Sequence, residues 1–251
     1  MSDFFLAVSL ITMLLGGKGV GTATGFFYLK NETTYLVTNR HVVVDETKGL
    51  KPDALRLKLH TDARDVTQNV DRTIPLYDNV GPKWHFHRDY PKIPIDIAVI
   101  EIDPKQLEGT IIKTLSREAF FPRDKYILAP GEDIMVLGFP RGFSDEKHNL
   151  GLLRNALISS AYGVNFNGLP LFVIDANLHP GMSGSPVMTK PKTILPTKTG
   201  HVMSQTPVTF FLGIFSATIS KVLPSRQEEA LGLGIVWYSN LIEQIIDDIR
   251  R

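Results

Sequence analysis

The 251-residue sequence contains no cysteine, and this absence excludes several kinds of site. Without thiols, the chain has no disulfide, no thiolate zinc site and no cysteine nucleophile. An excess of charge of one sign is also missing, because 27 lysines and arginines balance 26 aspartates and glutamates to a net charge of +1. The charge balance therefore gives no reason to expect a nucleic acid or an anionic membrane as a partner.

Long hydrophobic runs are missing as well. The apolar run at residues 4–15 is shorter than the roughly 20 residues that a membrane-spanning helix needs, so we expect no stable membrane span. No positively charged segment precedes this run and no small-x-small cleavage site follows it closely. We expect a buried first strand here, with a targeting or membrane-associating element as the alternative. A cytoplasmic location is favoured, because the run makes no convincing signal peptide.

What the chain does contain is a series of short β-rich runs separated by Gly, Pro, Asn and Asp, a pattern typical of an all-β barrel or sandwich. Residues 103–131 lack clean alternation and contain three prolines, which favours a connector between two β halves. Residues 190–208 are rich in Lys, Thr and Pro and are predicted to form an inserted surface loop. One terminal helix is expected, capped by Ser239, with one apolar face made of Leu241, Ile242, Ile245, Ile246 and Ile249.

Three residues have the chemistry that acyl transfer by serine requires: a hydroxyl, a base and a carboxylate that orients the base. His41 directly follows an apolar strand in "LVTNRHVV" (36–43), and Asp96 begins another in "IPIDIAVIEI" (93–102). Ser183 lies in the glycine-rich stretch "HPGMSGSPV" (179–187). Each residue alone is an ordinary structural histidine, turn aspartate or turn serine. Their occurrence together, in the order His, Asp, Ser, predicts a catalytic site.

The segment around Ser183 also offers backbone donors for an oxyanion. Gly181 and Gly184 give the chain the freedom to turn N–H groups outward. We therefore predict that Gly181, Met182 and Ser183 form an oxyanion hole, with the N–H groups of Gly181 and Ser183 as its donors.

These segments resemble those of the trypsin-like (chymotrypsin-fold) serine proteases, and more closely their bacterial HtrA-like branch. "GTATGFFY", "LVTNRHVV", "DIAVIEI" and "HPGMSGSPV" occur in the family's order, and the resemblance runs from about residue 5 to residue 240. It implies an all-β fold of two six-stranded antiparallel β-barrels with a C-terminal α-helix. Residues 1–110 would form the N-terminal barrel with His41 and Asp96. Residues 111–251 would form the connector, the C-terminal barrel with Ser183, and the helix.

The resemblance implies a serine endopeptidase that hydrolyses a polypeptide substrate without a cofactor. Ser183 would attack the scissile carbonyl, His41 would act as base and then acid, and Asp96 would orient the imidazole. One alternative is a catalytically silent protease-fold protein with a binding or scaffold role. Another is an α/β-hydrolase, but the stretch lacks the final glycine of Gly-x-Ser-x-Gly and the order of the three residues is wrong.

Some positions depart from the family pattern. Met182 stands where many digestive members have an aspartate that pairs with a freed N-terminus, so we expect control through ordering of the loop at 141–151 instead. A regulatory protein partner or self-association stays open. The chain ends soon after its terminal helix, so we expect no PDZ domain. His179 replaces the usual asparagine of HtrA-like members and is either a tolerated loop residue or a contact to substrate or to the serine loop.

The resemblance also implies which residues line the substrate pocket. No acidic residue occurs at Asn177, in "FSAT" (215–218) or in "GLG" (232–234), the positions that the resemblance assigns to the pocket. We therefore expect a small or medium apolar residue before the scissile bond. His85 and His87 lie two residues apart, but no third ligand is near in sequence, so no metal site is expected. The pocket residues are Asn177, Phe215, Ser216, Ala217, Thr218, Gly232 and Gly234.

Overall fold

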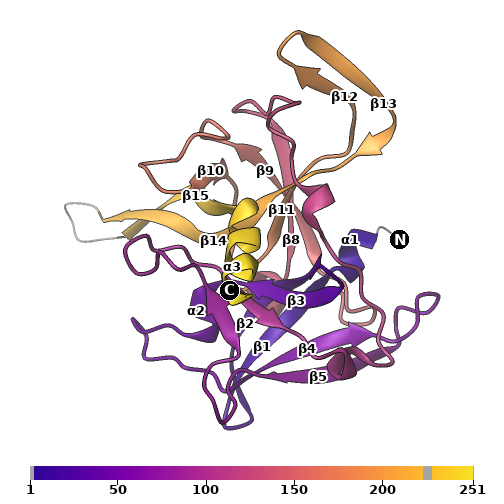
Figure 1. Cartoon of the computed structure of the whole chain (residues 1–251), viewed down its shortest axis with the longest axis vertical. Coiled ribbons are helices and arrows are strands. Elements are labelled where there is room, and N and C mark those ends of the chain that lie inside the picture. Colours follow the sequence, from indigo (N-terminus) through magenta and orange to yellow (C-terminus); the bar gives the residue numbers. More distant parts are fainter. Residues whose placement is uncertain (1–2, 223–227, 251) are drawn as a thin grey trace.

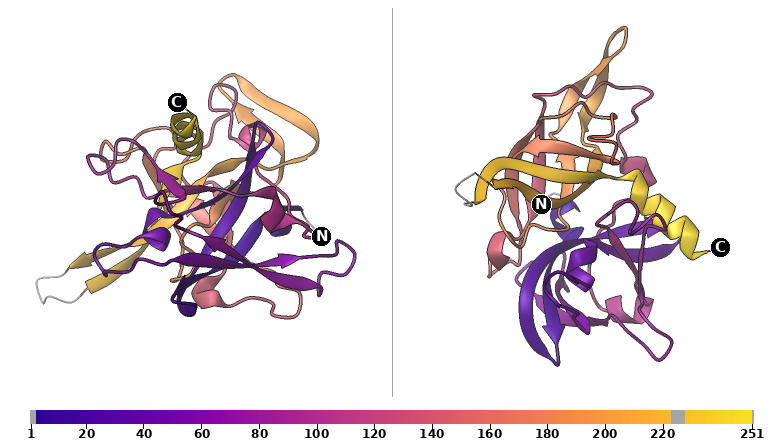
Figure 2. Two further views of the ribbon diagram at one scale, coloured as in Figure 1. Left: turned by 60° about the horizontal axis from the view of Figure 1, so that its bottom comes forward. Right: turned by 90° about the vertical axis from the view of Figure 1, so that its left-hand side faces the viewer.

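Strands dominate the computed structural model, which describes residues 3–222 and 228–250 (Figure 1). They gather into two halves that follow one another along the chain, and Figure 2 shows the halves as two lobes in its right-hand view. The all-β prediction is confirmed.

The N-terminal half is a seven-stranded sheet in the order β5-β4-β1-β2-β3-β7-β6, with antiparallel neighbours throughout. This corrects the expected six-stranded barrel, because a seventh strand is present and no described ladder joins β5 to β6. The extra strand is only three residues long, too short to show an alternating pattern in the sequence. The strands are β1 (Val8–Leu15), β2 (Lys18–Lys30), β3 (Thr33–Thr38), β4 (Ala54–His60), β5 (Asn69–Pro75), β6 (Trp84–Phe86) and β7 (Ala98–Glu101).

The C-terminal half contains a closed barrel of six strands in the order β10-β15-β14-β11-β8-β9, as expected for this half. Closure leaves these strands without free edges, so their backbone N–H and C=O groups are paired around the ring. The strands are β8 (Asp133–Gly138), β9 (Leu152–Ile158), β10 (Leu171–Asp175), β11 (Pro186–Thr189), β14 (Phe211–Val222) and β15 (Glu228–Tyr238).

A hairpin interrupts the barrel between β11 and β14. It consists of β12 (Lys192–Thr197) and β13 (Gly200–Val208), which pair only with each other and project from the body in Figure 1. The segment at 190–208, predicted as an inserted surface loop, is an exposed insertion but folds as a hairpin. Most side chains of β13 are exposed, so the segment lacks the apolar alternation by which a half-buried strand is recognised.

The helices are few and short. The predicted first strand is observed as β1, with one turn of helix before it. None of the helices within residues 3–222 and 228–250 is long and apolar enough to cross a membrane. The α-helices are α1 (Asp3–Leu6), α2 (Arg40–Val43) and α3 (Asn240–Ile249), and the 3-10 helices are η1 (Pro104–Leu107), η2 (Arg117–Ala119) and η3 (Pro140–Gly142).

The predicted terminal helix is α3, and it fastens the two halves together. Leu241, Ile242, Ile245 and Ile246 are buried in an apolar cluster that draws side chains from both halves, as the amphipathic pattern predicts. Each buried side chain of this size contributes about 1.5–3 kcal/mol. Ser239 occupies the cap position without making a side-chain cap hydrogen bond.

Each half also has an apolar cluster of its own, one within the N-terminal sheet and one within the C-terminal barrel. The boundary at residues 110–111 stays a prediction.

Candidate active site

His41 and Asp96 are brought together by two neighbouring strands. β3 pairs with β7, and the two residues lie just beyond the paired ends, His41 in α2 and Asp96 two residues before β7. The sequence "RHVV" fixes α2 because Val42 and Val43 are buried in the N-terminal core, which leaves His41 partly exposed.

Asp96 holds His41 by two hydrogen bonds. The backbone N–H of His41 donates to Oδ1 of Asp96 at 3.0 Å, and Nδ1 of the ring lies 2.7 Å from Oδ2. A ring fixed through Nδ1 keeps Nε2 available to act as a base. The buried neighbours Ile95 and Ile97 anchor the carboxylate on either side.

A serine from the other half of the molecule completes this arrangement. The Oγ of Ser216 donates to Oδ2 of Asp96 at 2.6 Å, and Nδ2 of Asn39 donates to the Asp96 carbonyl at 2.7 Å. Burial by itself would raise the pKa of Asp96. The hydrogen bonds from His41 and Ser216 and the charge of His41 outweigh burial, and the pKa lies below its usual value. The carboxylate is therefore kept ionised beside the imidazole.

Ser183 lies in the loop between β10 and β11, directly after a β-turn whose third position requires glycine. Met182 N–H donates to His179 C=O at 3.1 Å and closes a β-turn with Pro180 second and Gly181 third. Gly181 has φ = +93°, and proline followed by glycine is the signature of a type II turn. A Cβ on Gly181 would lie 2.4 Å from Phe139 O and 2.7 Å from Arg141 N. The sequence "HPGM" therefore encodes this turn.

The two predicted oxyanion donors are oriented through the carbonyls of their own peptide groups. Pro180 C=O accepts from Arg141 N–H at 2.5 Å, and Met182 C=O accepts from Ser185 N–H at 3.0 Å. In a trans peptide the N–H points opposite to the C=O, so holding these carbonyls fixes the N–H groups of Gly181 and Ser183. Neither N–H donates a hydrogen bond within the described part of the chain, so both are available to a ligand.

His41 and Ser183 line one cavity of about 380 Å³, together with His179, Pro180 and other residues. The Oγ of Ser183 donates to Ser216 C=O at 3.1 Å, and no hydrogen bond to His41 is present among the described residues. The four residues that the sequence assigns to this centre, His41, Asp96, Gly181 and Ser183, are thus brought to one place. Met182 is fully buried in the apolar cluster of the barrel.

The predicted pocket residues divide into two groups. Phe215, Ser216, Ala217 and Thr218 line this cavity, whereas Asn177, Gly232 and Gly234 do not. Asn177 is exposed and its carbonyl accepts a hydrogen bond from Arg154 at 2.8 Å. The cavity has two further lining residues that the sequence did not suggest, Asp45 and Lys48, which form an ion pair at 3.0 Å.

The sequence matches a family model described as the trypsin-like peptidase domain over residues 23–193. The chain belongs to the trypsin-like peptidase domain family. The resemblance seen in the sequence motifs is thereby confirmed, and membership supports a serine endopeptidase. The HtrA-like branch is consistent with these findings. No curated protein matches the sequence.

Solved structures show the same fold as this trypsin-like domain. The serine endoprotease of Yersinia pestis aligns with a TM-score of 0.53 at 14% identity, over 98% of this chain and 63% of that one, so this chain spans less than two thirds of its length. An inactivated protease paralogue of the scabies mite gives 0.57 at 18% identity, covering 99% and 96%. The protease Anisep of Arthrobacter nicotinovorans gives 0.53 at 13% identity, covering 97% and 94%.

Sequence reasoning about this trypsin-like domain missed one role. Ser216 appeared only as a pocket residue, yet it hydrogen-bonds Asp96 from 120 positions away. The β14–β15 register shifts between Phe215 and Ala217, so Ser216 lies at a β-bulge, which re-aims a side chain. A single sequence contains no signal for such a pair.

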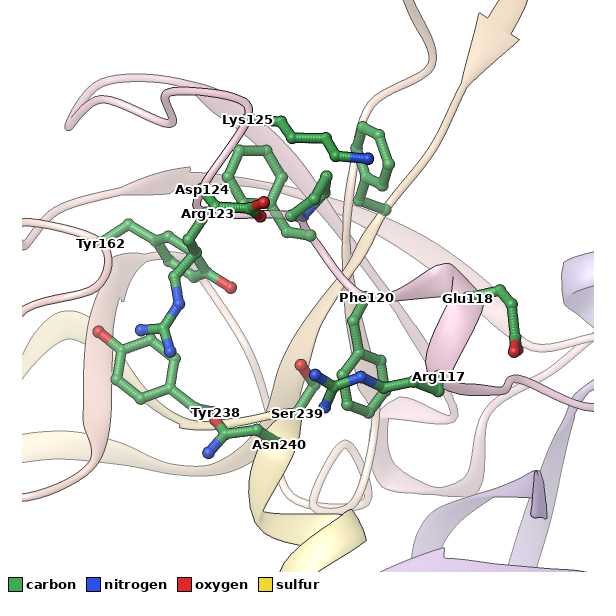
Figure 3. A pocket seen from close by; sticks show the side chains of 13 residues that line it. Arg117, Glu118, Phe120, Arg123, Asp124, Lys125, Tyr162, Tyr238, Ser239 and Asn240 are labelled. Carbon is green, nitrogen blue, oxygen red and sulfur yellow. The ribbon is translucent and has the colours of Figure 1, made fainter. Parts of the chain in front are cut away.

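A second cavity, of about 450 Å³, lies where the connector passes the start of α3 (Figure 3). Ser239 lines it, but no histidine does, so the hydroxyl has no base there. The guanidinium of Arg123 lies over the Tyr238 ring at 5.3 Å, and that of Arg117 over the Phe120 ring at 5.1 Å. The charges around it are mixed in sign, comprising Arg117, Arg123, Lys125, Glu118 and Asp124. It offers neither the catalytic chemistry nor the field of one sign that would define a site.

The histidine pair considered as a metal candidate has other partners. His87 is buried and its Nε2 lies 2.8 Å from Oε1 of Gln244 in α3. His85 lies in β6, and burial lowers its pKa. His87 therefore serves the packing of α3 on the N-terminal half.

Proposed function

We propose that this trypsin-like domain is a serine endopeptidase that uses His41, Asp96 and Ser183 as a catalytic triad. The observation that carries the proposal is that His41, held by Asp96, and Ser183 line one cavity, beside two backbone N–H groups with no described partner. This is the set of groups that acyl transfer by serine requires.

The proposed reaction follows from these positions. Ser183 Oγ attacks the carbonyl carbon of a peptide bond while Nε2 of His41 takes the hydroxyl proton, and the N–H groups of Gly181 and Ser183 bind the oxyanion. The C–N bond then breaks and His41 returns the proton to the departing amine. Water then attacks the acyl carbon while His41 takes one of its protons. The C–O bond to Ser183 Oγ breaks, His41 returns the proton to that oxygen, and the carboxylic acid product leaves. Asp96 stays ionised and stabilises the imidazolium.

One rotation is required before the first step. Ser183 Oγ donates to Ser216 C=O, so the hydroxyl must reorient to donate to His41. Catalytic hydrogen bonds are often long or misdirected without substrate and form in the complex. We propose that a substrate carbonyl in the oxyanion hole favours the rotated hydroxyl.

The alternative function is a silent protease fold with a binding or scaffold role. Two observations favour it: the Ser183 hydroxyl points to Ser216, and an inactivated paralogue has the same fold. The intact pairing of His41 with Asp96 argues for catalysis instead, because a binding protein has no need to orient a base.

We propose that the residue before the scissile bond is small or medium and apolar. Phe215, Ala217 and Thr218 line the cavity, and its one acidic lining residue, Asp45, is paired with Lys48. A peptide-library profile dominated by Arg or Lys would contradict this preference.

We propose that activity is controlled by ordering of the loop at 141–151 rather than by an inserted N-terminus. Met182 is packed among apolar side chains, where an ion pair would have no place. The loop is held to β4 by two hydrogen bonds, from Nδ2 of Asn149 to Lys58 C=O at 2.9 Å and between His60 Nε2 and His148 C=O at 2.8 Å. Arg141, at its start, is the residue that orients the Pro180–Gly181 peptide.

Cleavage of an unfolded protein such as reduced casein tests the function. Wild type should produce fragments from internal cleavage, and Ser183→Ala should produce none above background. Ser185→Ala is the matched control: its buried Oγ has no hydrogen-bond partner among the described residues, so its loss should leave the rate within about twofold. No cleavage by a folded wild type would favour the silent scaffold.

A further inference from the structure

Thr24 lies at the junction of the two halves. It is hydrogen-bonded to the serine loop and to the end of β3, but it does not line the cavity of the candidate active site. It belongs to β2 in the N-terminal sheet, and its side chain has no exposed surface. In the sequence Thr24 lies between Ala23 and Gly25, and nothing in this stretch indicates a polar role for it. We propose that Thr24 is a positioning residue that sets the geometry of the oxyanion hole, an inference that rests on the proposed function.

Every polar group of Thr24 is hydrogen-bonded to a neighbouring segment. Its N–H donates to Ser183 C=O at 2.9 Å, and its C=O accepts from Oγ1 of Thr38 at 2.8 Å. Its hydroxyl donates to Gly181 C=O at 2.8 Å and accepts from Phe139 N–H at 3.1 Å. One buried residue thus joins the serine loop, Phe139 directly before η3, and the end of β3, three residues before His41.

The hydroxyl couples the two segments that orient the Gly181 N–H. Arg141 N–H holds Pro180 C=O, and Arg141 lies two residues after the Phe139 N–H that Thr24 binds. On the other side of Gly181, the same hydroxyl binds the Gly181 carbonyl. The Thr24 hydroxyl oxygen therefore helps to position both peptide groups that flank Gly181, the following one directly and the preceding one through the segment from Phe139 to Arg141. A peptide group is planar, so any shift of these partners turns the N–H away from the oxyanion.

Thr24 differs from a structural threonine because its hydroxyl binds Gly181 C=O, which belongs to this turn, and Phe139 N–H, which lies two residues before the Arg141 that holds the turn. Valine has nearly the same shape but would leave Phe139 N–H and Gly181 C=O buried without their partner. The turn is then free to move toward other partners. The loss would fall on the transition state, because the oxyanion forms only there, and substrate binding in the ground state would be spared.

The test compares Thr24→Val with Thr24→Ser, measuring kcat and KM on one peptide substrate. Thr24→Val should lose about 10-fold to 100-fold in kcat with KM within about threefold, less than the 10²–10³-fold that follows removal of a whole oxyanion donor. Thr24→Ser keeps the hydroxyl and should restore kcat to within about threefold of wild type. A peptide boronate, which mimics the tetrahedral intermediate, should lose affinity for Thr24→Val by the same factor as kcat.

Thr189→Val is the matched control. Thr189 is also buried, and its hydroxyl also accepts a backbone N–H, from Phe210 at 2.9 Å, but it lies in β11 away from the turn. Its substitution should lower the melting temperature to a similar degree and leave kcat unchanged. If Thr24→Val does not fold, Thr24→Ala is measured instead, with the same expected loss of kcat.

Two outcomes separate this inference from the proposed function. If wild type cleaves through Ser183 and Thr24→Val keeps kcat within about twofold, the inference on Thr24 is wrong and the proposed function stands. Equal losses of kcat in Thr24→Val and Thr189→Val would also overturn it, because general destabilisation would then explain both. A folded wild type without activity would remove the proposed function itself.

Discussion

Replacing Gly181 by alanine is the sharpest local perturbation that the structure offers. The residue has φ = +93°, where an L side chain is strained by about 1–2 kcal/mol. The added Cβ would lie 2.4 Å from Phe139 O and 2.7 Å from Arg141 N, both backbone atoms that cannot rotate away. The turn must therefore shift, and the hydrogen bond from Arg141 to Pro180 that orients the Gly181 N–H is lost.

The expected cost follows from the loss of that donor. Removing one oxyanion-hole donor typically lowers kcat by about 10²–10³-fold, or roughly 2.7–4 kcal/mol of transition-state stabilisation. Gly181→Ala should show this loss in kcat on a chromogenic peptide, with a smaller change in KM. Its melting temperature should fall by about 2–8 °C, since about 1–2 kcal/mol shifts a domain of this size by roughly 2–4 °C per kcal/mol.

Gly168→Ala separates backbone strain from the loss of the donor. Gly168 has φ = +79°, close to that of Gly181, but a Cβ there would meet no atom within 4 Å. It should lower the melting temperature by a few degrees and keep the kcat of wild type. A folded Gly181→Ala variant with kcat within about threefold of wild type would refute the assignment of this N–H to the oxyanion hole.

The other predictions concern Asp96, Asp45, Tyr28 and Asn149. Asp96→Asn should fold and lower kcat by about 10⁴-fold, because the amide no longer fixes the required imidazole tautomer; steady-state rates near those of wild type would contradict this. Burial by itself would raise the pKa of Asp45. Hydrogen bonds from Thr47 and pairing with Lys48 outweigh burial and lower this pKa from 3.8 to about 2. A lowered pKa stabilises the fold above pH 3.8. In urea unfolding, wild type should therefore exceed Asp45→Asn by up to about 2 kcal/mol of unfolding free energy, and this difference should shrink between pH 5 and pH 2.5. A difference that does not change with pH would contradict the lowered pKa. Tyr28→Phe removes the buried hydrogen bond to Glu243 in α3 and should cost about 1–2 kcal/mol of unfolding free energy, whereas an unchanged urea midpoint would show that α3 docks without it. Asn149→Gly keeps the left-handed backbone (φ = +52°) but loses the bond to β4, and it should lower kcat if the loop at 141–151 controls the site; an unchanged kcat would count against loop control.

The local features of the site were readable from the sequence because neighbours along the chain encode them. "HPGM" specifies its own turn, and "RHVV" buries its valines and presents His41. The amphipathic pattern of α3 likewise predicted which residues are buried. These are effects of proline, glycine and apolar spacing over a few positions, which one sequence displays directly.

The features that were missed depend on contacts between distant segments. Ser216 reaches Asp96 across 120 positions and Thr24 reaches Gly181 across 157, and a hydroxyl in a strand shows no sign of its partner. β6 is too short to produce a period, and the mostly exposed β13 has no buried face to alternate with. Asn177 was assigned to the pocket by analogy, whereas its exposed position depends on how one loop leaves the barrel.

Trapping the acyl-enzyme tests the central claim most directly. The protein is mixed with a nitrophenyl ester, quenched in acid within the first turnover and digested, and the acylated residue is located by mass spectrometry. The proposed mechanism predicts one acyl group per chain, on Ser183, absent from Ser183→Ala and formed more slowly in Asp96→Asn. An acyl group on another residue, or one that persists in Ser183→Ala, would contradict the account.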